Sequence, residues 1–220
     1  MDRRRFLAAT GTATLLGLAG CSDQGSTGTT TADGTSPEPS TTSPGGPRTT
    51  TEPPGTALNN GSFEDGLAGW RVGTDLPPDP NTGDPVDAAA SVEQGDAGDR
   101  PPVTDGRRLL SLFIDGRQDD GTIWVQQQVD LRPFDSLAVD VYSGMASANT
   151  VTKVAAYAGA LPDTPLVETA FDTTRPADAH EGWATVEYDT SPEPLGLVAV
   201  GVSVVWETEV TTFLDHVRLR

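Results

Sequence analysis

Three side chains that alternate along one predicted strand have the chemistry to recognise a sugar. Trp124, Gln126 and Gln128 are spaced two residues apart, so they share one face of a strand. An indole ring can stack on the C–H face of a sugar ring, while the flanking amides hydrogen-bond its hydroxyls. Asp140 and Tyr142 alternate in the same way on the next predicted strand. We therefore predict that these five residues bind carbohydrate.

The alternative for Trp124 is burial, under a long loop over 73–106 or beneath another strand. The other tryptophans are predicted to be structural. Trp70 and Trp183 each follow a glycine and are expected to plug the starts of strands. Trp206 continues a row of alternating valines and is expected in the core.

The N-terminus carries two targeting signals. Arg3–Leu7 resembles the twin-arginine signal for export, and Leu18–Cys21 resembles a lipobox, in which the cysteine is lipidated. The uncharged stretch between them has 15 residues, whereas a membrane span needs about 20. We expect residues 1–20 to be a Tat-type lipoprotein signal peptide. The lipid at Cys21 would anchor the exported protein to the outer face of the cell membrane.

Residues 21–56 are predicted to be a disordered tether. Of the 35 residues from 22 to 56, 28 are Ser, Thr, Pro or Gly, so this segment has almost nothing to bury. Residues 57–220 have the length and patterning of one folded domain. Cys21 is the only cysteine in the chain, which excludes an internal disulfide.

The charge of the chain restricts its partners and its solvent. There are 32 acidic and 14 basic residues, and Lys153 is the only lysine. Acid excess with few lysines resembles the proteins of extremely halophilic archaea, and molar salt would screen the self-repulsion. An acidic bacterial surface protein is the alternative. The chain offers no basic patch for phosphates, so nucleic acid is not an expected partner.

The apolar pattern predicts an all-β domain. Period-two alternation broken by turn residues predicts many short strands and no capped helix, which favours a two-sheet antiparallel β-sandwich. The expected strands cover 109–115, 122–131, 137–143, 152–159, 166–172, 183–189, 197–206 and 212–219, with shorter ones near 69–72 and 88–93.

Both ends of this domain resemble a known family. The opening Asn60–Trp70 and the final Thr212–Leu219 are similar to carbohydrate-binding modules of the family 4/9 type, which are galactose-binding-like jelly rolls. The resemblance implies a jelly-roll fold and a polysaccharide or envelope glycan as partner. It also makes the opening turn a better explanation of Asn60-Gly61-Ser62 than an N-glycosylation site.

The same resemblance implies a structural calcium ion. In these modules the opening glutamate and the last-strand aspartate commonly help to hold Ca²⁺, and here those positions are Glu64 and Asp215. Asp215 has the parity of Phe213 and Val217, so its carboxylate is expected on the core side, where it needs a metal or another partner. A salt bridge or a capping hydrogen bond is the alternative.

Catalysis has little support in the sequence. His180 and His216 are isolated and fit no metal-ligand spacing. The acidic clusters could supply carboxylate pairs for glycoside hydrolysis, but an acidic surface also explains them. We expect non-catalytic carbohydrate binding. The rivals are a structural or protein-binding envelope protein and a small glycan-cleaving enzyme.

Overall fold

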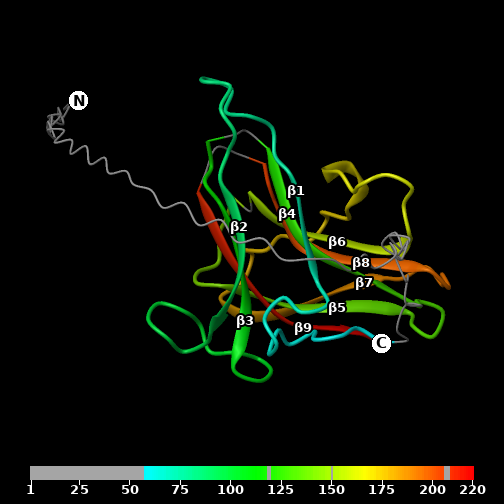
Figure 1. Ribbon diagram of the computed structural model, residues 1–220. Helices are drawn as coiled ribbons and strands as arrows, with labels where there is room; N and C mark the ends of the chain where they lie inside the picture. Colours follow the sequence, from blue (N-terminus) through cyan, green and yellow to red (C-terminus); the bar gives the residue numbers. More distant parts are fainter. Residues whose placement is uncertain (1–56, 118–119, 150, 206–208) are drawn as a thin grey trace, which may run out of the picture. The chain divides into compact units, whose positions relative to one another are not determined.

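The computed structural model describes residues 57–117, 120–149, 151–205 and 209–220 (Figure 1). The signal peptide, Cys21, the tether and Trp206 lie outside the described residues, and their expected roles stay predictions. The described residues hold these strands: β1 (Arg71–Asp75), β2 (Ala88–Gln94), β3 (Arg108–Ile114), β4 (Gly121–Val129), β5 (Ser136–Ser143), β6 (Thr152–Ala160), β7 (Gly182–Asp189), β8 (Gly196–Val204) and β9 (Val210–Leu219).

The strands form two antiparallel sheets that pack face to face. One sheet has the order β1-β4-β8-β6 and the other β2-β3-β9-β5-β7. The core between them is built from the inward rows of both sheets, such as Ile123 and Val125 of β4 against Val139 and Val141 of β5. This arrangement confirms the predicted jelly-roll β-sandwich. The only helical element among the described residues is a single 3-10 turn, Glu168–Ala170.

Strand β8 lies at the centre of the four-stranded sheet, as its two apolar faces predicted. Every residue from Gly196 to Val204 is buried. The valines face the core, while Ala199 and Gly201 face the other side of the sheet. At Gly201 a Cβ would lie 2.0 Å from the carbonyl oxygen of Ile123 on β4. Glycine is therefore required here by the close approach of β4.

The strand predicted over 166–172 is wrong. This segment belongs to the long β6–β7 connection, residues 161–181, whose portion 161–177 we call the strap. Leu166 and Phe171 of the strap are buried against Trp124 on the outer face of the four-stranded sheet. The apolar residues that suggested a strand are these two anchors, with the 3-10 turn between them. Asp172 then exchanges backbone hydrogen bonds with Ala156 at the edge of β6.

A β-bulge in β9 overturns the predicted orientation of Asp215. Asp140 of β5 is paired with Asp215, and Ala138 is paired with Arg218, so Val139 faces two residues of β9. His216 takes the left-handed φ of 48° that this bulge requires. The parity of the strand changes there. Val217 faces the core, but Asp215 shares the outer face of the five-stranded sheet with Asp140.

The opening turn is held by Asn60. Its side-chain amide donates to the carbonyl oxygens of Gly66 and Ala68 and accepts from the N–H of Asp65. The indole N–H of Trp70 donates to the carbonyl oxygen of Asn60 over 2.9 Å, and the ring is buried. Trp70 is thus the structural plug that was predicted. The amide of Asn60 is occupied in the turn, which agrees with the structural explanation of this motif.

Candidate functional site

Trp124 is not an open platform. Its side chain is 2 % exposed because the strap covers it, with the ring of Phe171 4.9 Å away between centroids. The indole N–H donates to Oε1 of Gln126 over 2.6 Å, so these two side chains do share the outer face, as predicted. Gln128 lies farther along this face and is exposed. Burial of Trp124 was the alternative and the structure shows it, but the cover is the strap and not the 73–106 loop or another strand.

The five predicted sugar-binding residues do not form one site. Trp124, Gln126 and Gln128 stand on β4, whereas Asp140 and Tyr142 stand on β5 in the other sheet. Both groups face away from the core, so they lie on opposite outer faces of the sandwich. The predicted constellation was wrong because β4 and β5, although adjacent in sequence, belong to different sheets.

A row of aromatic rings crosses the outer face of the five-stranded sheet. Tyr142 of β5 is paired with Trp183 of β7 on one side and with Phe213 of β9 on the other. The Tyr142 ring lies 5.4 Å from that of Trp183 and 6.4 Å from that of Phe213, measured between centroids. All three are half-buried. We call Tyr142, Trp183 and Phe213 the aromatic row.

Sequence reasoning found only Tyr142 of this row. Trp183 was predicted to be a structural plug, and parity along the last strand predicted an inward Phe213. Alternation along β5 and β7 assigns Tyr142 and Trp183 each to one face of its own strand. Only the pairing of the two strands brings the rings together. The signal that was available is the presence of an aromatic residue in each of three strands, at 142, 183 and 213.

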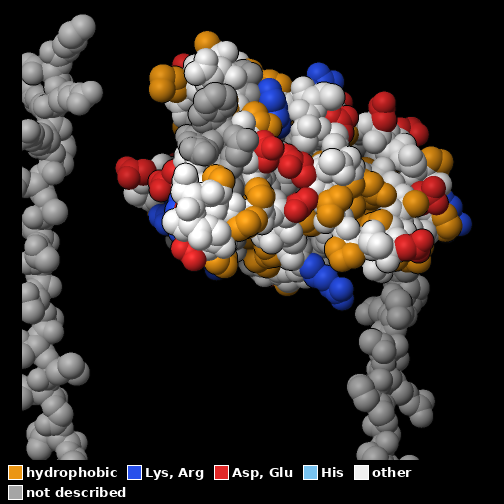
Figure 2. Space-filling model, turned by 90° about the horizontal axis from the view of Figure 1, so that it is seen from above, with side chains coloured by type: hydrophobic (Ala, Val, Ile, Leu, Met, Phe, Trp, Pro, Cys, Tyr) orange, Lys and Arg blue, Asp and Glu red, His pale blue; other side chains and the backbone are white. Residues whose placement is uncertain are grey.

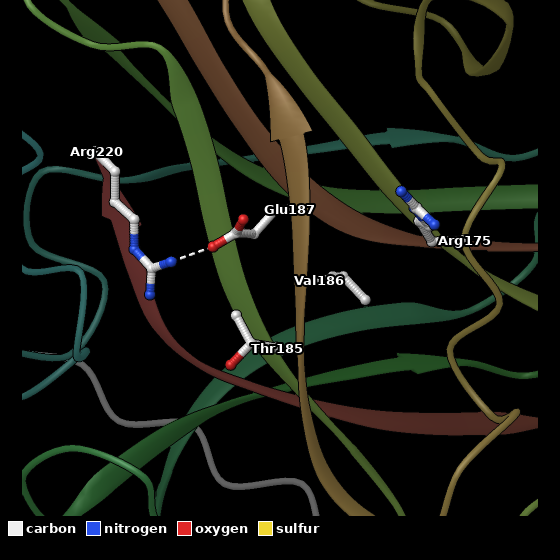
Figure 3. A pocket seen from close by; sticks show the side chains of 5 residues that line it. All are labelled: Arg175, Thr185, Val186, Glu187 and Arg220. Atoms are coloured by element: carbon white, nitrogen blue, oxygen red, sulfur yellow. Dashed lines mark hydrogen bonds and ion pairs between the residues drawn. The ribbon is translucent and has the colours of Figure 1, made fainter.

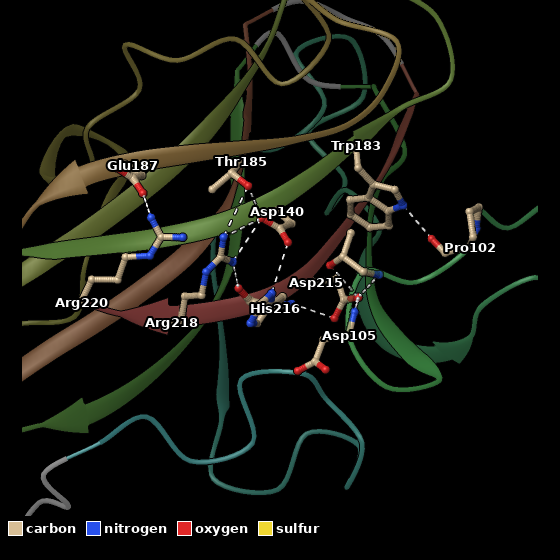
Figure 4. Close-up of polar contacts among 11 residues, drawn as sticks. Pro102, Asp105, Asp140, Trp183, Thr185, Glu187, Asp215, His216, Arg218 and Arg220 are labelled. Carbon is tan, nitrogen blue, oxygen red and sulfur yellow. Dashed lines mark hydrogen bonds and ion pairs between the residues drawn. The ribbon is translucent and has the colours of Figure 1, made fainter.

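The β2–β3 loop, residues 95–107, runs across this face. The indole N–H of Trp183 donates to the carbonyl oxygen of Pro102 over 2.6 Å. Farther along the loop, the backbone N–H groups of Thr104 and Asp105 donate to Oδ2 of Asp215 over 2.7 and 3.0 Å (Figure 4). The loop is thereby fixed to β7 and β9, and it forms one border of the aromatic row.

Beside the row lies a buried polar network centred on Asp140. Its Oδ1 accepts from the hydroxyl of Thr185 over 2.6 Å and from the guanidinium of Arg218 over 3.1 Å, and Nδ1 of His216 lies 3.4 Å from its Oδ2 (Figure 4). Burial opposes ionisation, but the hydrogen bonds from Thr185 and Thr104 and the charge of Arg218 outweigh it and hold the pKa of Asp140 below its usual value. The carboxylate of Asp140 is thus occupied by contacts with Thr185, Arg218 and His216 of its own chain.

Asp215 and Glu64 both fix the β2–β3 loop. Asp215 is fully buried and also accepts from the Thr104 hydroxyl and the N–H of His216. Burial raises the pKa of Asp215 in spite of these bonds. Oε1 of Glu64 accepts from the N–H groups of Arg107 and Arg108 over 2.6 and 2.8 Å. The bond from Arg107 is the main cause that lowers the pKa of Glu64.

These contacts favour the hydrogen-bonded alternative for Asp215 over a shared calcium ion. Calcium binds oxygen ligands, whereas the groups around the two carboxylates are N–H and O–H donors. Within the described residues, no group of three or more His, Cys, Asp or Glu side chains could hold a metal. Calcium at Glu64 and Asp215 stays a prediction, and the donor set around them does not fit it.

Several hollows border the five-stranded sheet, and two of them lie at β7 and beside the aromatic row. One, of about 530 Å³, lies at the edge strand β7, with Thr185, Glu187 and Arg220 on one side of the strand and Arg175 beyond it (Figure 3). The other, of about 430 Å³, adjoins the aromatic row. It is lined by residues from the ends of β5, β6 and β9 and from four loops: Asp99, Tyr142, Ser143, Gly144, Thr152, Ala177, Asp178, Glu209, Val210, Thr211, Thr212 and Phe213. We call this second hollow the row cavity.

The two hollows differ in charge, because the one at β7 contains Arg175 and Arg220 beside Glu187, whereas the row cavity contains three carboxylates. Figure 2 shows acidic side chains over one face of the domain, with fewer basic ones between them. Several arginines are already paired with carboxylates, as in Arg117 with Asp115 and Arg132 with Asp130. The row cavity therefore suits a ligand that is not strongly anionic.

Comparisons with known proteins leave the family open. No protein-family model matches the chain, and no curated protein matches it significantly. Several solved structures are similar in fold. One is a Stig cyclase from Fischerella sp. TAU, with a TM-score of 0.45 and 18 % identity over 74 % of this chain and 96 % of that one.

Two further structures are similar to about the same degree. The K1 adhesin domain of Lys-gingipain from Porphyromonas gingivalis W83 has a TM-score of 0.46 and 18 % identity, over 76 % of this chain and 98 % of that one. A family 11 carbohydrate-binding module from Clostridium thermocellum has a TM-score of 0.41 and 10 % identity, over 74 % and 94 %. These values describe a distant likeness of fold and carry no information on function.

Within the described residues, no helix has the length and apolar character needed to cross a membrane.

Proposed function

We propose that this protein binds a carbohydrate without catalysing a reaction, and that the aromatic row with the row cavity is the binding site. The observation that supports this most is the junction of three rings with a hollow lined by carboxylates and hydroxyls. Rings offer faces and edges to the C–H groups of a sugar, and the polar side chains can read its hydroxyls. A volume of about 430 Å³ is in the range of small-molecule sites.

The site is built on rigid elements. Tyr142, Trp183 and Phe213 stand on three hydrogen-bonded neighbouring strands, and Trp183 is fixed by its bond to Pro102. Binding surfaces that are already ordered lose less conformational entropy when a ligand binds. A sugar should therefore bind more tightly to this ordered surface than to one that must first reorganise.

The contacts of Asp140 and Asp215 favour binding over glycan cleavage. Asp140 and Asp215 are cross-strand partners. A glycan-cleaving enzyme would need two such neighbouring carboxylates. However, Asp140 is 6 % exposed and Asp215 is fully buried. Each is engaged by donors of its own chain, so neither is free to protonate a glycosidic oxygen or to attack a sugar.

The location of the protein is part of the same proposal. The twin-arginine signal and the lipobox at Cys21 would place the domain outside the cell on a lipid anchor, joined to it by the tether that the sequence predicts over 21–56. A domain held there could bind an envelope glycan or an environmental polysaccharide. The acid excess and the single lysine support a halophilic setting, in which the domain should lose structure as salt falls well below 1 M.

The test is binding of the purified protein to a panel of polysaccharides in molar salt. Trp183→Ala and Phe213→Ala should weaken binding by about tenfold or more, the effect of losing one well-packed aromatic contact. Tyr157→Ala is the matched control, because Tyr157 is also a half-buried aromatic residue but lies on the other sheet. Loss of binding in the control alone would refute the site, and no binding to any glycan would favour a structural or protein-binding role.

A further inference from the structure

The row cavity has a charge that a neutral sugar does not require. Three carboxylates line it, from Asp99, Asp178 and Glu209, and they come from three different loops. Its lining contains no Lys, Arg or His among the described residues. Hydroxyls of a neutral sugar can be read by amides and by one or two carboxylates. Three like charges around one hollow attract a cation, and water screens part of their mutual repulsion because Asp99 and Glu209 are exposed.

One of these carboxylates has an unsatisfied oxygen. Oδ1 of Asp178 is buried and accepts no hydrogen bond within the described part of the chain. A buried acceptor without a donor is destabilising, and such groups often mark the place of an absent water or ligand. Because this oxygen is closed to solvent, a donor in the cavity would satisfy it once the Asp178 side chain rotates.

The aromatic lining points to the same kind of ligand. Tyr142 and Phe213 line the cavity together with the carboxylates. The negative faces of aromatic rings attract organic cations, and this attraction grows when water is excluded. A bare metal ion fits less well, because no cluster of three or more His, Cys, Asp or Glu side chains among the described residues could hold one.

We propose that the row cavity recognises a protonated amino sugar, so that the glycan bound at this site contains free amino groups. This inference rests on the proposed function and adds the chemical class of the ligand. The ammonium group would lie among the carboxylates of Asp178, Glu209 and Asp99, and the sugar ring against Tyr142 and Phe213.

The test compares two ligands that differ only in acetylation. Isothermal titration of the purified protein with a glucosamine tetrasaccharide and with its N-acetylated counterpart should show the free amine binding about tenfold more tightly, the effect of one partly desolvated cation contact. Asp178→Asn and Glu209→Gln should each reduce this preference, because they weaken binding of the free amine more than binding of the acetylated ligand. If one of them folds poorly, Asp99→Asn provides the same test.

Glu193→Gln is the matched control. Glu193 lines another hollow that also contains tyrosine and carboxylate side chains, near Tyr188 and Asp189. The control should keep the full preference for the amine. Equal or tighter binding of the acetylated or a neutral tetrasaccharide would overturn the inference, as would a preference that survives the cavity variants. If neutral glycans bind and Trp183→Ala abolishes this, the proposed function stands while the amino-sugar inference fails.

Discussion

Replacing Asp215 should destabilise the domain by releasing the β2–β3 loop. The carboxylate accepts four hydrogen bonds, from the N–H groups of Thr104, Asp105 and His216 and from the Thr104 hydroxyl, at 2.7 to 3.1 Å. A hydrogen bond to a charged group contributes about 1.5–3 kcal/mol. Two effects reduce the sum in Asp215→Ala. The variant regains the several kcal/mol spent on burying the charge, and the exposed loop residues can bind water instead.

The net loss expected for Asp215→Ala is about 3 kcal/mol of unfolding free energy. For a domain of this size that corresponds to a melting temperature about 6–12 °C lower. The measurement is urea and thermal unfolding in molar salt. Asp105→Ala is the matched control, because it keeps the backbone N–H that binds Asp215, and it should change the stability by less than about 0.5 kcal/mol.

The same experiment distinguishes the hydrogen-bonded loop from calcium. If the loop donors satisfy Asp215, adding a chelator to the wild-type protein should leave its melting temperature unchanged. A chelator effect as large as that of Asp215→Ala would refute this reasoning and restore the calcium site at Glu64 and Asp215. An Asp215→Ala variant that is as stable as the wild type would refute the hydrogen-bonded loop without supporting calcium.

Three further predictions concern stability and the covered tryptophan. Gly201→Ala should cost about 3 kcal/mol or more in urea unfolding, because its Cβ would meet β4, whereas Gly144→Ala, with open space around it, should be neutral. Phe171→Ala should cost about 3 kcal/mol and shift tryptophan emission to the red by uncovering Trp124, yet leave glycan binding unchanged; tighter binding would return the site to Trp124. The lowered pKa of Asp140 means that its contribution to stability is present above the unfolded pKa and is lost as the pH falls below about 4. Acid unfolding curves should therefore be shallower for Asp140→Asn, and an unchanged curve would contradict the assignment.

The fold could be predicted because each strand carries its own alternation. The valine row of β8 and the inward residues of β4 and β5 identify their faces without knowledge of the partner strands. The strap could not be predicted, since Leu166 and Phe171 are apolar residues that pack on Trp124 and not on a neighbouring strand. The local sequence pattern does not distinguish an apolar residue buried within a strand from one in a loop that packs on the face of a sheet.

The site was less predictable because it depends on pairing between distant strands. The sequence places Tyr142 on an outer face, but the rings of Trp183 and Phe213 join it only through the order β9-β5-β7. The bulge at Asp215 and His216 is also invisible to parity, because a single left-handed residue reverses the faces of all later residues in the strand. The charges of the row cavity come from loops, whose paths follow no simple period.

Sugar binding on the five-stranded sheet can be tested directly by NMR, by observing the tryptophan indole N–H signals while an oligosaccharide identified by the binding panel is added. Single substitutions would assign the signals. We expect a large shift of the Trp183 signal and little change for the buried Trp70 and Trp124. A shift confined to Trp124, or saturation of binding with no change at Trp183, would contradict a sugar site on this sheet.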